Sequence, residues 1–401
     1  MIADRNIICV ASNWFYDPTS KHQLMKLLAE RNHILWVNYH GSRRVTASGA
    51  DLKTAIGRIG QFLAGPRQVA SNITVITPIV VPLPGSTRAR RVNRWILLRQ
   101  IRRALRRLPA RPVQVWSFAP DVSYLAGGFG EECLVYYCVD EFSEFAGYDS
   151  QAIVRQERDL IARADLVVTT SRRLQASKQA CHPRTHLVTH GVDYEHFAKA
   201  TSPDLTEPED VADLPRPILG FFGLIQEWVD LDLLAEVARR RPGWSIVLIG
   251  EMRTAIGPGR QPPNLHVLGR RPYETLPAYC RAFDVGLIPF RVNALTLKVN
   301  PIKLREYLAA GLPVVSTPLP EAEAYQPLVE IADGVDAFVD ACQRAVTGNT
   351  PEQIERRQAA MRQETWRAKI ELLSQLVEDA CTENKEGSLG QERTDGEGPC
   401  D

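Results

Sequence analysis

Short apolar runs alternate along this chain with segments in which apolar positions recur every three or four residues. The runs that predict buried strands in the first half are residues 7–11, 34–38, 73–76, 113–118, 134–139, 166–170 and 185–189. Helical spacing follows at residues 21–31, 88–108 and 151–164. Strand, helix and strand in this order are typical of a parallel sheet covered by helices. The first half therefore predicts a doubly wound α/β domain.

A second series of the same kind begins after residues 198–217, which are polar, acidic and rich in Pro, as in a linker. Its strands are predicted at residues 218–222, 245–249, 265–268, 285–289 and 313–316. The complete prediction is a first domain at residues 1–200, a linker at 201–217, a second domain at 218–350, a helix at 351–381 that returns to the first domain, and a disordered tail at 382–401.

Composition narrows the class of protein. The chain has 401 residues, of which 44% are hydrophobic and 24% charged, as in ordinary globular proteins. A net charge of +1 argues against nucleic acid as a partner. The eight Cys are scattered without a C-x-x-C pair, which favours buried thiols in a reducing compartment. Neither a secretory signal nor a run of about 18 apolar residues is evident, so we predict a cytoplasmic protein.

The most informative segment covers residues 300–316. Asn300 and Pro301 favour a turn that starts a helix, and Gly311 ends it. Lys303 and Glu306 lie three residues apart on that helix, on neighbouring faces. A helix N-terminus with a nearby Lys suits a phosphate, and a carboxylate one turn further on can accept hydrogen bonds from ribose hydroxyls. The pattern predicts a site for a nucleotide diphosphate.

This segment resembles the donor-binding helix of GT-B glycosyltransferases, in particular the retaining, group-4-like enzymes of bacterial surface-polysaccharide biosynthesis. The family pattern is a Pro and a Lys, a Glu, then Tyr-Leu-Ala-x-Gly-x-Pro-Val-Val, and residues 301–315 match it closely. Weaker resemblance extends over residues 5–375. It implies two Rossmann-like domains facing a cleft, and a hexosyltransferase-type enzyme that uses a nucleotide-diphosphate sugar, needs no metal and has no cofactor.

The resemblance also implies donor-side residues. Gly223, after the strand at residues 218–222, would let the backbone approach the diphosphate, although a packing turn alone is the alternative. Lys303 would supply a cation and Glu306 would bind ribose; a surface charge paired with Lys303 or Arg305 is the alternative for Glu306. Asn300 belongs to the same donor set, and Arg271 or Arg270 would flank the base.

Two departures from the family pattern concern charge. Where many relatives carry an Arg and a Lys after the first glycine loop, this chain has Gln226 and Glu227. Lys298 stands eight residues before Glu306, where relatives carry a Glu that contacts the transferred sugar. Cationic stabilisation of the leaving diphosphate would then come from Lys298, Lys303 or Arg291. We predict a catalytic role for Lys298, with a solvated loop residue as the alternative.

The first domain is expected to hold the acceptor. Asp140 follows a predicted strand, where a parallel sheet presents side chains to ligands, so we predict that it is catalytic and orients the donor sugar or the acceptor hydroxyl. A helix N-cap is the alternative. The predicted acceptor-side residues are Asn13, Trp14 and Asp17. Asp230 and Asp232 form a D-x-D pattern within a helix, which we interpret as a solvated face and not a metal site.

Residues 88–111 contain ten Arg among apolar residues at helical spacing. One interpretation is attachment to an anionic membrane surface, which would place the protein peripherally at the inner face of the membrane. The other is a core-facing helix with a solvated Arg face. The acceptor would be a glycan or a lipid-linked glycan.

Two other functions remain open from the sequence. The first is a non-hydrolytic nucleotide-sugar epimerase of the same fold. The second is a catalytically inactive partner subunit that binds a nucleotide sugar, because the Arg and Lys after the glycine loop and the first Glu are missing.

Overall fold

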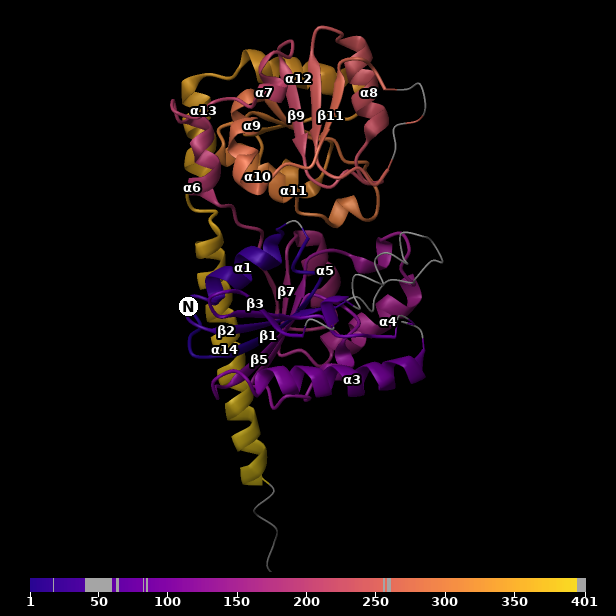
Figure 1. The fold of residues 1–401 in the computed structure, drawn as a ribbon, viewed down its shortest axis with the longest axis vertical. Coiled ribbons are helices and arrows are strands. Elements are labelled where there is room, and N and C mark those ends of the chain that lie inside the picture. The colour runs from indigo at the N-terminus through magenta and orange to yellow at the C-terminus, as the bar shows by residue number, and fades with distance from the viewer. Residues whose placement is uncertain are drawn as a thin grey trace, which may run out of the picture. The chain divides into compact units, whose positions relative to one another are not determined.

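The computed structural model describes residues 1–16, 18–39, 60–62, 65–81, 83, 86–254, 257 and 261–394, with side chains to residue 383. Two compact units are formed (Figure 1). Unit 1 is Met1–Thr189 together with the chain from Ile370 onward, and unit 2 is His190–Lys369. Each unit has its own sheet and its own core.

Unit 1 is built on an eight-stranded sheet of order β3-β4-β2-β1-β5-β6-β7-β8. The strands are β1 (Asn6–Ala11), β2 (His33–Asn38), β3 (Arg67–Ala70), β4 (Ile73–Ile76), β5 (Val113–Ser117), β6 (Cys133–Cys138), β7 (Leu166–Thr169) and β8 (Thr185–Leu187). All neighbours pair in parallel except β3, which is antiparallel to β4. β1 and β6 are buried along their whole length, because they lie between strands and under helices. The strand order reverses between β1 and β5, and ligands of such sheets bind at the carboxyl ends near this point.

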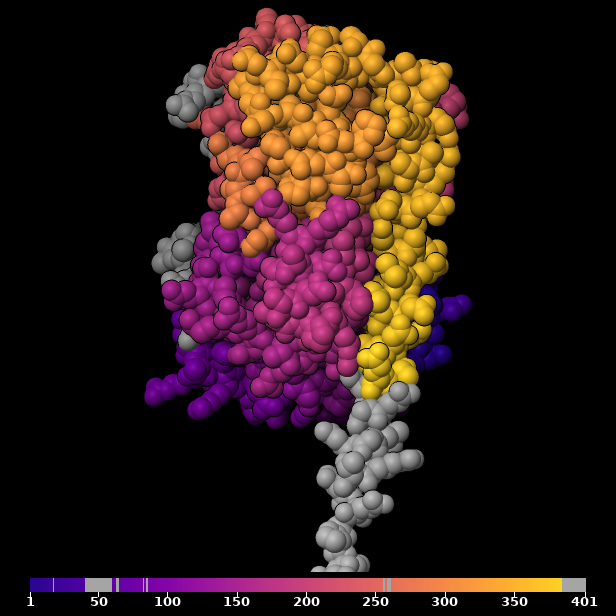
Figure 2. Space-filling view, turned by 180° about the vertical axis from the view of Figure 1, so that it is seen from behind, coloured from indigo at the N-terminus to yellow at the C-terminus, as the bar shows by residue number. Residues whose placement is uncertain are grey.

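The helices of unit 1 are α1 (Ser20–Leu28), α3 (Thr87–Leu105), α4 (Ser150–Ile161) and α5 (Arg172–Gln179), with short 3-10 helices η1 (Ser123–Leu125) and η2 (Phe142–Glu144). The last helix, α14 (Trp366–Thr394), begins in unit 2 and continues into unit 1. Figure 2 shows it in yellow on the surface. Its residues Ile370, Leu373 and Val377 are buried, so one face of α14 belongs to the core of unit 1.

Unit 2 holds a six-stranded parallel sheet of order β11-β10-β9-β12-β13-β14. Its strands are β9 (Ile218–Phe222), β10 (Ser245–Ile249), β11 (Leu265–Gly269), β12 (Val285–Ile288), β13 (Val314–Ser316) and β14 (Val329–Ile331). In order along the chain this is 3-2-1-4-5-6, the arrangement of the doubly wound nucleotide-binding fold, and it reverses between β9 and β12.

Helices cover both faces of this sheet, as Figure 1 shows. They are α6 (Tyr194–Phe197), α7 (Glu209–Ala212), α8 (Leu231–Arg240), α9 (Leu276–Ala282), α10 (Ile302–Ala309), α11 (Pro320–Glu323), α12 (Val335–Thr347) and α13 (Pro351–Met361), with 3-10 helices η3 (Ala198–Thr201), η4 (Tyr273–Thr275) and η5 (Thr296–Lys298).

The unit boundaries differ from those predicted. Residues 190–217 belong to unit 2, because Val192, Phe197, Ala200 and Val211 are buried in its core. The expected long helix from residue 351 is two helices, α13 and α14. The break arises because the segment between them pairs with the start of unit 2: the Val192 N–H donates to the carbonyl of Glu364 at 2.8 Å. α14 continues to Thr394, past the predicted start of the tail at residue 382.

Among the described residues, the helices are too short or too polar to span a lipid bilayer.

Candidate functional site

Three neighbouring strands of unit 2 have a glycine at or directly after their last residue. Gly223 follows β9 with φ 137°, Gly250 follows β10 with φ 143°, and Gly269 ends β11 with φ 75°. Residues with a Cβ rarely adopt these conformations. The Gly223 N–H donates to the carbonyl of Ile249 at 2.8 Å, and the Gly250 N–H donates to that of Gly269 at 2.9 Å. At these three strands the carboxyl edge of the sheet is therefore lined by backbone.

A side chain at either of the first two glycines would collide with its surroundings. A Cβ on Gly223 would lie 2.0 Å from Cε of Lys303, and one on Gly250 would lie 1.8 Å from the carbonyl oxygen of Gly223. The Lys303 stem thus packs directly against the loop after β9. The structure brings together two residues, Gly223 and Lys303, that the sequence proposed separately for one diphosphate.

Helix α10 presents Lys303 and Glu306 near its N-terminus. Pro301 is the N-cap, with φ −69° and ψ 114°, and Pro suits a position whose N–H has no helical partner. Lys303 is half-buried and Glu306 is 9% exposed. Burial raises the pKa of Glu306 to about 7; Lys303 opposes the shift, and the Asp193 carboxylate adds to it. The carboxyl therefore changes charge near neutral pH.

Asp193 and Tyr273 complete the surroundings of Glu306. Asp193 accepts a hydrogen bond from the His196 N–H at 3.3 Å and caps α6. Burial, Glu306 and Asp193 together raise the pKa of Tyr273. His196 stacks on the Tyr273 ring at 4.6 Å and contacts its carbonyl through Nε2 at 3.0 Å. Sequence spacing gave no signal for this group, because its members lie on α6, η4 and α10.

Arg305 is a further residue of α10 that sequence reasoning did not assign. It is 1% exposed, and its Nη1 donates to Oδ1 of Asn300 at 2.7 Å. Its Nε lies 3.5 Å from Glu364 Oε2, and its guanidinium carbon lies 5.1 Å from the centre of the Tyr325 ring. Asn300, predicted to bind the donor, is thus 3% exposed and held by the helix that it precedes.

The other predicted cations have protein partners. Arg271 donates to Asp210 Oδ2 at 2.7 Å through Nη2 and to the Tyr279 hydroxyl at 2.8 Å through Nε. Arg291 pairs with Asp232 at 2.7 Å and with Asp230 at 3.2 Å. Lys298 ends η5 and is half-buried. The roles proposed for Arg271 and Lys298 stay predictions.

In unit 1, the predicted acceptor-side residues follow β1. The Trp14 N–H donates to Asn38 Oδ1 at 2.8 Å, and its ring lies 4.9 Å from the rings of both His22 and Trp36. Asn13 is buried and accepts the Phe15 N–H at 3.2 Å. Asp17 lies outside the described residues.

Asp140 lies two residues beyond the end of β6, at the same sheet edge. Burial raises the pKa of its carboxyl, and the ammonium of Lys21 opposes that shift. Lys21 is the first charged residue of α1 and donates to the Ser12 hydroxyl at 3.2 Å. Burial lowers the pKa of Lys21, whereas Asp140 raises it. Lys21 was not predicted, because nothing near residue 21 indicates a partner at residue 140.

Known proteins resemble this chain in sequence and in fold. Residues 216–347 match the family model described as glycosyl transferases group 1. Unit 2 carries a group 1 glycosyltransferase domain. The matched residues include Gly223 and, on α10, Lys303 and Glu306.

One relative by sequence is a Bacillus subtilis protein, TuaH, named as a glycosyltransferase of teichuronic acid biosynthesis. It is 27% identical over 260 residues, which are 59% of this chain and 64% of the relative. The aligned part thus spans less than two thirds of that relative.

Solved structures resemble the whole chain, beyond the group 1 domain. Anabaena HepE in complex with UDP has a TM-score of 0.65 and 14% identity, with 94% of this chain and all of that chain covered. Sucrose-phosphate synthase from Thermosynechococcus elongatus has a TM-score of 0.66 and 13% identity, with coverage of 94% and 98%. At this identity the likeness concerns the fold. The prediction of a GT-B fold with two doubly wound units is confirmed.

Proposed function

We propose that the protein transfers a hexosyl unit from a nucleotide-diphosphate sugar to a glycan or lipid-linked acceptor in polysaccharide biosynthesis. The observation that carries the proposal is the contact between Lys303 and Gly223 at the carboxyl end of β9. HepE, which shares the fold, has been solved with UDP and with UDP-glucose, and TuaH is named for a polysaccharide pathway. These likenesses support the same class of donor for this chain.

Each residue has a physical task in the proposed reaction. Backbone N–H groups after Gly223 and the Lys303 ammonium stabilise the diphosphate, whose charge grows as its bond to the sugar breaks. Glu306, when ionised, accepts hydrogen bonds from the ribose hydroxyls. Asp140 orients the acceptor hydroxyl, and Lys298 contacts the transferred sugar or the diphosphate. The acceptor oxygen bonds to the sugar, and its proton passes to the leaving diphosphate; the proposal includes retention at the anomeric carbon and no metal or cofactor.

The proposal is tested with the full chain in two stages. A thermal-shift screen of UDP-, GDP- and ADP-sugars identifies the donor, and mass spectrometry then follows its transfer to lipid-linked saccharides. A glycosylated acceptor is the expected product. An epimerised nucleotide sugar formed without acceptor would indicate an epimerase, and binding without turnover across the acceptors would indicate an inactive partner subunit.

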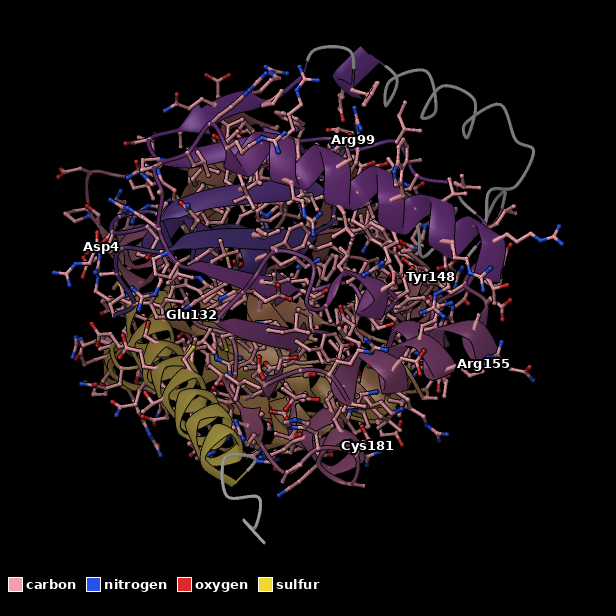
Figure 3. All side chains as sticks on the ribbon, turned by 90° about the horizontal axis from the view of Figure 1, so that it is seen from below. Asp4, Arg99, Glu132, Tyr148, Arg155 and Cys181 are labelled. Carbon is pink, nitrogen blue, oxygen red and sulfur yellow. The ribbon has the colours of Figure 1, made fainter. Side chains whose placement is uncertain are left out.

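We further propose that the protein works peripherally at the cytoplasmic face of an anionic membrane, with α3 as the contact. Leu97, Ile101 and Ala104 bury one face of α3 in unit 1. The other face is a band of Arg in which Trp95 is 64% exposed, and Arg99 lies 5.7 Å from its ring (Figure 3, where Arg99 is labelled). Arg91, Arg94, Trp95, Leu98, Arg99, Arg102, Arg103 and Arg106 line a surface hollow there. Guanidinium groups around an exposed indole suit lipid phosphates at an interface.

A further inference from the structure

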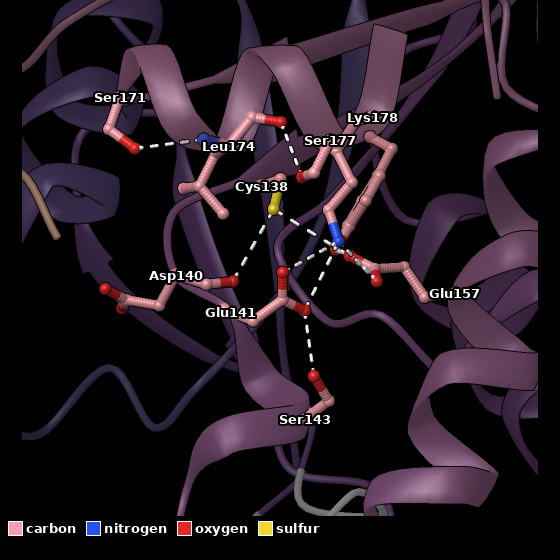
Figure 4. Close-up of polar contacts among 10 residues, drawn as sticks. Cys138, Asp140, Glu141, Ser143, Glu157, Ser171, Leu174, Ser177 and Lys178 are labelled. Atoms are coloured by element: carbon pink, nitrogen blue, oxygen red, sulfur yellow. Dashed lines mark hydrogen bonds and ion pairs between the residues drawn. The ribbon is translucent and has the colours of Figure 1, made fainter. Parts of the chain in front are cut away.

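A buried cluster of three charged side chains lies next to the loop that carries Asp140 in unit 1 (Figure 4). Its members are Lys178, Glu141 and Glu157. Lys178 of α5 is 6% exposed, and its Nζ donates to Glu157 Oε2 at 2.7 Å and to Glu141 Oε2 at 3.2 Å. Glu157 comes from α4, and Glu141 from the loop after β6. Three segments that are distant in sequence therefore meet at one ammonium group.

Burying these three charges costs free energy of desolvation. Two carboxylates with exposures of 5% or less share one cation, and burial penalises every charge that is not fully compensated. The Tyr136 hydroxyl donates to Glu157 Oε1 at 2.6 Å, and the Ser143 hydroxyl donates to Glu141 Oε1 at 2.9 Å. Because a buried ion cluster of this kind contributes little net stability, its location calls for another reason.

The location is the loop that carries Asp140. The Thr170 hydroxyl donates to the carbonyl of Val139 at 2.8 Å, and the Cys138 thiol donates to that of Asp140 at 3.5 Å. The next residue, Glu141, is held by Lys178. In Figure 4 the Asp140 carboxylate points away from this cluster, and among the described residues it receives no hydrogen bond. The loop is held at Val139, Asp140 and Glu141, whereas the Asp140 carboxylate is attracted by the Lys21 ammonium but receives no hydrogen bond among the described residues, so it can accept one from a ligand.

We propose that Lys178 is a positioning residue: by holding Glu141 against Glu157, it fixes the loop after β6 and directs the Asp140 carboxylate toward the acceptor. The proposal rests on the proposed function for the role of Asp140. The rigidity of the loop after β6 can be measured without any transfer assay.

The sharpest variant is Glu141→Gln. It removes the charge of Glu141 and so weakens the hold of Lys178 on the loop, but it leaves Lys178 paired with Glu157. The remaining buried charges balance, and the protein is expected to fold. Because a displaced catalytic group loses rate steeply, kcat should fall by about 10- to 100-fold, whereas the Kd for the nucleotide should stay within about twofold. Arg173→Met, at an exposed position of α5, the helix that carries Lys178, is the control and should leave both values unchanged.

A double-mutant cycle separates positioning from general damage. If Lys178 and Glu141 act through Asp140, Glu141→Gln should lower kcat by less than about threefold when Asp140→Asn is already present. An equal loss of kcat in both backgrounds would overturn the proposal.

Hydrogen exchange supplies the readout that needs no turnover. Amides 138–144 should exchange at least about tenfold faster in Glu141→Gln, while the strands β1 and β5 keep their protection. If exchange at residues 138–144 is unchanged in Glu141→Gln, the proposal that Lys178 fixes this loop is overturned. Absence of transfer by the unaltered protein, by contrast, would overturn the proposed function and leave the exchange result to decide the role of Lys178.

Discussion

The carboxyl edges of the two sheets differ in what they present. In unit 2, β11 ends in a glycine with positive φ and β9 and β10 are followed directly by one, so the edge carries no side chain at these three positions. In unit 1, the strands at the edge are followed by side chains, among them Asn13 after β1 and Asp140 after β6. None of the described strands of unit 1 ends in or is followed directly by Gly.

The ligands proposed for the two edges would account for this difference between backbone and side chains. A diphosphate carries several equivalent oxygens and is well held by many N–H dipoles that converge on it. An acceptor hydroxyl offers one proton and one lone-pair direction, so a positioned carboxylate suits it better. Two sheets of similar topology can therefore divide a reaction, one by exposing backbone and the other by aiming side chains.

The largest effect is expected from converting the edge of unit 2 into one with a side chain. Gly223→Val places a branched Cβ against the Lys303 stem and forces an unfavourable φ, so nucleotide affinity should fall by about 3 kcal/mol, on the order of 100-fold. Isothermal calorimetry with the identified donor measures it. Gly243→Ala is the control, since Gly243 has open space around it. Equal affinity in both variants would contradict the backbone site.

Removing the carboxylate of α10 should have a smaller effect. Glu306→Ala should weaken nucleotide binding by about 1–3 kcal/mol, the value of charged hydrogen bonds to ribose. The same calorimetry with a 2′,3′-dideoxy nucleotide should show almost no difference between the unaltered protein and the variant. An unchanged affinity for the normal nucleotide would exclude the ribose role.

Lowering the pH should cause part of the loss of nucleotide affinity that is expected for Glu306→Ala. Because burial raises the pKa of Glu306 to about 7, the carboxyl is mostly protonated at pH 6 and mostly ionised at pH 8. Nucleotide affinity should therefore fall by up to about tenfold, about 1.4 kcal/mol, from pH 8 to pH 6. Glu306→Gln should remove that part of the pH dependence, and an identical pH profile in the variant would show that another group titrates.

The same pKa has a consequence for stability. Since the folded pKa is above the unfolded value, the folded state holds the proton more tightly, and the free energy of unfolding should fall as the pH rises from about 4.5 to 7. Urea unfolding should find Glu306→Gln more stable than the unaltered protein at pH 8 and similar to it at pH 4.

The smallest effect concerns the Arg band of α3. Arg99→Gln should weaken binding to phosphatidylglycerol vesicles by about 1 kcal/mol, about fivefold, because one guanidinium near an anionic surface contributes about that much. Co-sedimentation at low salt measures it, and phosphatidylcholine vesicles should bind neither form. Arg163→Gln, at an exposed position elsewhere in unit 1, is the control. Vesicle binding that is insensitive to both changes would reject α3 as the contact.

The sequence predicted those parts of the fold in which local pattern and tertiary structure agree. Residues 218–222 were predicted as a strand and form β9, because a fully buried parallel strand is an unbroken apolar run. The edge strand β3 was missed, since its sequence, Arg-Gln-Val-Ala, is mostly exposed and carries no such run. Gly311 after α10 was found because helix ends have strong local signals.

Residue spacing could propose candidate site residues only where they lie close together in the chain, and Gly223 was proposed from the family resemblance. Lys303 and Glu306 share one helix, so their spacing sufficed. Gly250, Lys21 and Lys178 were missed, because each acquires its role from a partner that folding brings from another strand or helix. The burial that raises the pKa of Glu306 likewise depends on residues that are distant in the sequence.

The paired segments at the two ends of unit 2 have a practical consequence. Val192 and Thr365 form a parallel bridge, and Trp366 donates back to the carbonyl of Val192 at 3.3 Å, so this unit starts and finishes at adjacent points. A module with neighbouring termini and its own core can be transplanted into a host protein at one insertion point. Residues 190–369 are thus a suitable segment for building chimeric proteins in which the proposed donor site is exchanged as one block.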